Sequence, residues 1–168
     1  NTPIKLVINH SLVKLDSVNI TISLSNNSTT NFVSKNLRLH TAIVEKDILF
    51  PSPAGTNGEI EFSFVMRKMF PSAEGTILGI DTIKAGQVLT FTFKEKMIEN
   101  VYSFRNMAVV AFLQNYDTKE VFQSELSEPK AIDPAVDFDL TVNDISGIPN
   151  NVDGGYCISE YIPKVEVV

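Results

Sequence analysis

Tryptophan is absent from this sequence of 168 residues, and there are only two histidines and one cysteine. The single cysteine, Cys157, cannot close an internal disulfide, and it lies far in the sequence from both histidines, His10 and His40. The histidines lack the spacing of a zinc site, and a nucleophilic cysteine needs a nearby base. The sequence also lacks a nucleophile elbow, a phosphate-binding loop and a dinucleotide fingerprint. We therefore predict that the chain is not an enzyme.

Clustered positive charge and long apolar runs are missing as well. The net charge is −6, and Arg67-Lys68 is the one adjacent pair of basic residues. Nucleic acids and anionic membranes are bound by clusters of Lys and Arg, so we predict neither as a partner. A membrane-spanning helix needs about 18 or more consecutive apolar residues, and no such run occurs. We therefore predict no transmembrane segment.

Alternation of apolar and polar residues is the main pattern that is present. It extends over residues 18–25, 59–66 and 88–94, and it is typical of strands with one buried face and one solvated face. Phenylalanine is common, with 11 residues, so we expect a core rich in phenylalanine. The apolar positions that we expect to face the core are Val18, Ile20, Ile22, Leu24, Ile60, Phe62, Phe64, Met66, Leu89, Phe91 and Phe93.

Two segments, 37–44 and 107–113, are apolar on both faces, which predicts central strands. The polar residues 115–118 separate the second of these from another strand and predict a hairpin. A short helical turn is expected within residues 95–106. Weaker strands are expected at 4–9, 76–80 and 119–126. Together these patterns predict an all-β fold, an antiparallel immunoglobulin-like β-sandwich of about seven to nine strands.

The pattern of apolar and polar residues changes near residue 128. Two prolines and a loss of alternation predict that residues 1–128 form the sandwich and that residues 129–136 form a linker. Residues 137–168 are expected to begin a second immunoglobulin-like module or to add strands to the first, because two strands alone cannot bury a core. We expect the chain to be a mature form or an excised piece of a longer protein.

Several stretches resemble the sandwich region of the Omp-twenty-eight-related outer-membrane proteins of Bacteroidota. The stretches that carry the resemblance are Leu37–His40, Ile43–Ile48, Val65–Pro71 with Gly75, Lys84–Gln87, and Val109–Asn115 with Thr118–Val121. The resemblance implies a secreted protein or one associated with the cell surface or outer membrane. It brings no catalytic residues, and the thioredoxin-like segment often found ahead of the sandwich in that family is missing here.

Residues 137–168 resemble the start of another repeat, of the kind found along cargo of type IX secretion. The stretches that carry this second resemblance are Asp139–Val142, Ile145–Pro149, Cys157 and Ile162–Val165.

Two groups of residues are candidates for contacts with a ligand or partner. Arg67 and Lys68 end a predicted strand beside Met69 and Phe70, and interfaces are enriched in Arg, Met and aromatic residues. Tyr116 stands at the predicted hairpin tip and is the best candidate for stacking on a glycan. The alternative for all three is an ordinary surface position.

Asp137 and Asp139 are the candidates for a metal site. Carboxylates near the predicted linker offer the oxygen ligands that calcium prefers. No Asp-x-Asp-x-Asp-Gly loop is present. The alternative is that Asp137 and Asp139 are neighbours on the solvent-exposed face of a strand and bind no metal. No other cofactor is predicted.

These observations favour a non-catalytic interaction or spacer module of a secreted or outer-membrane-associated protein. Its expected partners are other domains of the parent protein or surface proteins. Two alternatives stay open at this point. One is a glycan- or calcium-binding sandwich, and the other is an accessory domain of an enzyme whose catalytic domain is not in this chain.

Overall fold

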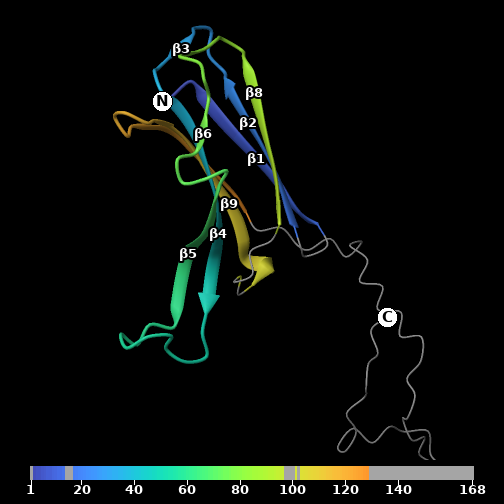
Figure 1. Ribbon diagram of the computed structural model, residues 1–168, viewed down its shortest axis with the longest axis vertical. Coiled ribbons are helices and arrows are strands. Elements are labelled where there is room, and N and C mark those ends of the chain that lie inside the picture. Colours follow the sequence, from blue (N-terminus) through green and yellow to red (C-terminus); the bar gives the residue numbers. More distant parts are fainter. Residues whose placement is uncertain (1, 14–16, 97–100, 102, 129–168) are drawn as a thin grey trace, which may run out of the picture. The chain divides into compact units, whose positions relative to one another are not determined.

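The computed structural model describes residues 2–13, 17–96, 101 and 103–128 (Figure 1). These residues belong to the first of two units into which the chain divides, Asn1–Val136. The predicted linker at 129–136 and the predicted second module at 137–168 lie outside the described residues. Both therefore stay predictions.

One sheet contains three antiparallel strands in the order β1 (Ile4–Val13), β2 (Ser17–Asn26), β8 (Val88–Lys96). Ile22 pairs with Phe91, and both point to the interior. Every second residue of β2 from Val18 onward is buried, while the residues between them are partly exposed. The alternation predicted for 18–25 and 88–94 is thus confirmed.

The second sheet has the order β10 (Val121–Ser127), β9 (Met107–Asn115), β4 (Leu37–Leu49), β5 (Glu61–Phe70), and β6 (Thr76–Ile77) also pairs with β4. Strands β4 and β9 occupy the middle of the sheet (Figure 1). Most of their residues are buried on both faces, so the prediction of two central strands is confirmed. The predicted hairpin between β9 and β10 is present as well.

Short elements complete the module. Strands β3 (Phe32–Val33) and β7 (Thr82–Ile83) pair with each other, and the 3-10 helix η1 (Phe104–Asn106) lies in the segment expected to hold a helical turn. Seven strands have at least seven residues, and three have two. The fold is therefore the predicted all-β antiparallel sandwich.

The core lies between the two sheets and is mainly aliphatic. Isoleucine, leucine and valine dominate the buried cluster, and Phe70 is the one fully buried phenylalanine among the described residues. Phe32, Phe91, Phe93 and Phe122 are partly buried and pack against this cluster. The expectation of a phenylalanine-rich core is therefore wrong. The flat rings cover the margins of the core, and branched aliphatic side chains fill its centre.

Strand β5 departs from the predicted pattern. We expected Ile60, Phe64 and Met66 to face the core, but they are 38%, 50% and 59% exposed. Phe64 has a φ of 54°, and the pairing register with β4 shifts between Ile43 and Val44, so strict alternation is lost. This part of β5 also pairs with the end of β4 that lies beyond the core cluster. No strand among the described residues pairs with the other edge of β5.

Candidate functional site

The hairpin between β9 and β10 is a tightly bonded loop. The side-chain oxygen of Asn115 accepts hydrogen bonds from the backbone N–H groups of Asp117 and Thr118, at 2.9 and 3.0 Å. Asparagine is suited to this role because its amide mimics a backbone turn. The backbone N–H of Lys119 donates to the carbonyl of Asn115, and the Gln114 side chain donates to the carbonyl of Lys119. The loop is therefore held in one conformation before any partner arrives.

Tyr116 lies in this loop between two cations. The guanidinium carbon of Arg38 is 3.4 Å from the centroid of the Tyr116 ring, and Nζ of Lys119 is 3.5 Å from it. Two groups that close to one centroid cannot share a face, so the ring is sandwiched between them. Each cation is attracted to the electron-rich face of the ring. The backbone N–H of Tyr116 donates to the carbonyl of Asn36, which fixes the ring beside β4.

Two acidic side chains in the neighbouring loops are hydrogen-bonded within the module. Asp117 accepts a hydrogen bond of 2.7 Å from the Asn36 side chain. Glu74 accepts one from the Ser72 hydroxyl, and this bond lowers the pKa of its carboxyl. Arg38 donates only to the backbone carbonyl of Glu74, at 3.0 Å. Among the described residues, neither Arg38 nor Lys119 forms an ion pair.

Aliphatic side chains flank this group on the outer face of the sheet. Ile77, Arg38, Gln114 and Val121 stand opposite one another on four adjacent strands, β6, β4, β9 and β10. Ile77 is 63% exposed and Val121 is 49% exposed. We call the surface formed by Arg38, Tyr116, Lys119, Ile77 and Val121 the hairpin surface. It combines cations, an aromatic ring and exposed aliphatic groups, as interfaces do.

His40 lies behind the hairpin surface and is 4% exposed. Its ring stacks on Phe112 with centroids 4.7 Å apart, and neither ring nitrogen makes a hydrogen bond of ordinary geometry. Burial lowers the pKa of His40, and the charge of Arg38 lowers it further. An interaction with the backbone of Ala73 raises the pKa, but it offsets only part of this lowering. A neutral ring is favoured here because an imidazolium would be buried beside a cation.

We expect this histidine to make the module less stable in mild acid. The unfolded chain binds a proton at His40 near the ordinary pKa of 6.5, whereas the folded chain binds it at a lower pH. The free energy of unfolding should therefore fall as the pH drops below 6.5. Urea unfolding at several pH values should show a smaller fall for His40→Gln than for the unmodified chain. Equal falls in both proteins would contradict this assignment.

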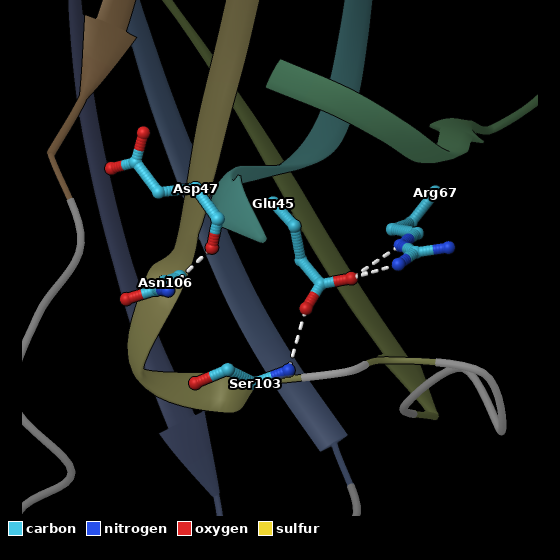
Figure 2. Close-up of polar contacts among 5 residues, drawn as sticks. All are labelled: Glu45, Asp47, Arg67, Ser103 and Asn106. Carbon is cyan, nitrogen blue, oxygen red and sulfur yellow. Dashed lines mark hydrogen bonds and ion pairs between the residues drawn. The ribbon is translucent and has the colours of Figure 1, made fainter. Parts of the chain in front are cut away.

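A second region of polar contacts surrounds the far end of β4 (Figure 2). An open cavity of about 420 Å³ lies there, lined by Asp47, Ile48, Leu49, Glu61, Phe62, Ser63, Ser103 and Asn106. The Asn106 side chain donates to the backbone carbonyl of Asp47 at 2.6 Å. This bond ties the segment before β9 to the end of β4.

Glu45 is the most deeply buried charge in the described residues, with no exposed surface. One carboxylate oxygen accepts hydrogen bonds from the Arg67 guanidinium, and the other accepts the backbone N–H of Ser103 at 2.6 Å (Figure 2). Both oxygens are thus bonded within the module. The arrangement is that of a structural ion pair.

The residues singled out in the sequence have different surroundings. Arg67 is bonded to Glu45, and Lys68 pairs with Glu95 of β8 at 3.1 Å. Phe70 is buried, so only Met69 of the two neighbouring apolar residues has partial exposure. Internal contacts therefore account for Arg67 and Lys68, and their contact with a partner stays a prediction. Tyr116 is the residue of the three whose neighbours are free cations.

Asp137 and Asp139 lie outside the described residues, so calcium binding there stays a prediction. In the described part of the chain, no three histidine, cysteine, aspartate or glutamate side chains gather as a metal site would require. Across the same residues, no helix has the length and apolar character needed to cross a bilayer.

Sequence reasoning missed Arg38, Lys119 and His40 as neighbours of Tyr116. Arg38 and His40 alternate with Leu37 and Leu39 in a central strand, which places them together on one face. The sequence therefore indicates that Arg38 and His40 are neighbours on one face of the strand. Their position beside Tyr116 depends on the pairing of β4 with β9, which pairs Leu37 with Asn115, and this register is not visible in the sequence.

The fold defines the chain as an antiparallel β-sandwich module. The pattern of the outer membrane protein Omp28 family matches residues 1–130, and the chain belongs to this family. That membership associates it with the outer membrane or the cell surface of Bacteroidota, as the resemblance implied. No curated protein matches the chain significantly.

Solved structures from Porphyromonas gingivalis share the fold. HBP35 is 14% identical with a TM-score of 0.56, and the match covers 80% of this chain and 43% of HBP35. A domain of the outer membrane lipoprotein Omp28 is 12% identical with a TM-score of 0.50, and the match covers 78% of this chain and 91% of that domain. At these identities the likeness concerns the fold alone.

A weaker likeness is to a calcium-binding mutant of Bacteroides uniformis β-glucuronidase 2. The TM-score is 0.38 at 11% identity, over 74% of this chain and 12% of the enzyme. A match of that quality carries no argument about activity.

Proposed function

We propose that this chain is a non-catalytic interaction module of a surface-associated protein and that its contact face is the hairpin surface. The observation that carries the proposal is the pair of cations on Tyr116, exposed beside aliphatic side chains and free of acidic partners. Tyr and Arg are the residues that most often dominate binding energy at protein interfaces.

The state of Glu45 supports a non-catalytic role. Both oxygens of this buried side chain are held by Arg67 and Ser103. A general base must reach a substrate proton within hydrogen-bond distance. Glu45 has no exposed surface through which it could do so.

The geometry of Tyr116 favours a protein partner over a stacked glycan. Sugar rings stack on an open aromatic face, as the sequence-based alternative for Tyr116 required. Both faces of this ring are covered, by Arg38 on one side and Lys119 on the other. The remaining exposed groups are the charges themselves and the aliphatic side chains of Ile77 and Val121.

Site-specific photo-crosslinking in cells that express the full-length protein tests the proposal. A photoreactive phenylalanine analogue at position 77 or 121 should form a covalent adduct with another protein or another domain. The same analogue at Thr90, which is exposed on the outward face of β8, should form none. The adduct should be lost when Tyr116→Ala is added. Equal adducts at all three positions, or none at 77 and 121, would refute the hairpin surface as the contact face.

A further inference from the structure

The hairpin surface places two cations on one aromatic ring, in a chain whose net charge is −6. Arg38 and Lys119 lie on opposite faces of one ring, and both also act on His40, which lies on the same face of β4 as Arg38. Like charges held this close repel each other, and an anion placed beside them relieves that repulsion. Among the described residues, no carboxylate lies within ion-pair distance of either cation, although the charge of Arg38 acts on Glu74 at longer range.

An unsatisfied polar atom under this surface points in the same direction. Nε of Arg38 is buried and has no hydrogen-bond partner among the described residues. Buried polar atoms without partners are uncommon in folded proteins, and each calls for an explanation such as an absent ligand. Arg38 therefore has donor capacity that the module itself does not use.

The flanking groups indicate what kind of anion fits. Ile77 and Val121 lie on either side of Arg38 and Gln114 in one row across the sheet. A small inorganic anion would leave these aliphatic groups in water, and a sulfated glycan offers little apolar surface to cover them. An acidic protein segment offers carboxylates for the cations and apolar side chains for the flanks.

From these contacts we infer that the hairpin surface binds an acidic protein segment, whose carboxylates pair with Arg38 and Lys119 while its apolar residues cover Ile77 and Val121. This inference rests on the proposed function and adds the chemistry of the partner. The rigid loop around Asn115 keeps Lys119 in place before binding, so little conformational freedom is lost on association.

Fluorescence anisotropy with the full chain and a labelled peptide of glutamate and valine residues tests the inference. A peptide with lysine in place of glutamate and a labelled heparin oligosaccharide serve as competing probes. The glutamate peptide should bind at low ionic strength and weaken as salt is added, because exposed charge pairs are screened. In Arg38→Gln/Lys119→Gln its affinity should fall by about tenfold or more, the loss expected for two charge contacts.

A double variant with the same change of charge provides the matched control. Lys84→Gln/Lys94→Gln removes two exposed lysines from other parts of the module. Its affinity for the glutamate peptide should stay within about twofold of the unmodified chain, since surface charges beyond a Debye length contribute little. Equal losses in the two double variants would overturn the inference. So would binding of the oligosaccharide without binding of the glutamate peptide.

Crosslinking separates failure of this inference from failure of the proposed function. Adducts at positions 77 and 121 that persist in Arg38→Gln/Lys119→Gln would leave the hairpin surface as the contact face but refute the acidic partner. Adducts that disappear in that variant but not in Lys84→Gln/Lys94→Gln would support both. Thermal unfolding of each variant checks that the module stays folded, and the salt dependence of the unmodified chain tests the inference without any variant.

Discussion

Removing the Arg67 side chain, as in Arg67→Ala, should lower the free energy of unfolding by about 3–5 kcal/mol. The expected loss is large because the substitution leaves Glu45 charged, fully buried and without its counter-ion. Among the described residues, the backbone N–H of Ser103 is the one hydrogen-bond donor that would remain on that carboxylate. Urea unfolding followed by circular dichroism measures the change.

Two further variants show whether the loss arises from the stranded charge. Glu45→Leu/Arg67→Met replaces both partners with apolar side chains, and it should recover most of the lost stability. Lys46→Ala breaks the neighbouring ion pair with Glu128, whose side chains are 33% and 64% exposed, and it should leave stability almost unchanged. A double variant as unstable as Arg67→Ala would show that the pair contributes through packing and not through charge.

Gly75→Ala should lower the free energy of unfolding by about 2–4 kcal/mol, because strain and overcrowding add together. Gly75 has a φ of +74°, in the left-handed region that side chains disfavour. A Cβ at this position would lie 2.9 Å from Nδ1 of His40 and 3.0 Å from the carbonyl oxygen of Leu39. The backbone of β4 cannot move away without disturbing its pairing with β9 and β6.

Gly79→Ala separates the two contributions. Gly79 has a φ of +68°, but a Cβ there would meet no atom within 4 Å, so only the backbone strain of about 1–2 kcal/mol should appear. The difference between the two variants then measures the contact with β4. Adding His40→Ala should shrink that difference, since it removes the closest side-chain atoms. Equal losses at Gly75 and Gly79 would contradict this account.

The elements that the sequence predicted well share a simple property. Strand β2 alternates strictly, and β9 is apolar on both faces, so each segment alone determines its exposure. Strand β5 also alternates in sequence, yet Phe64 and Met66 are exposed. Their exposure depends on a register shift and on where the opposite sheet ends, and neither is a local property.

The two polar sites depend on pairing between distant segments. Glu45 follows an apolar run in β4, but its burial is tolerated only because Arg67 and Ser103 come to it from elsewhere in the chain. Tyr116 could be singled out as an exposed ring at a hairpin tip. Its two cations could not, because Arg38 reaches it only through the register of β4 against β9.

The irregular backbone of β5 has a consequence for self-association. An open strand edge that displays Phe64 and Met66 would ordinarily be a template on which a second molecule adds its own strand. Here the left-handed residue Phe64 and the register shift beside Met66 interrupt the ladder at two nearby points. An approaching strand therefore finds only a very short regular stretch, too short for continuous hydrogen bonding. The distortion therefore disfavours aggregation through this solvent-exposed, apolar edge of β5.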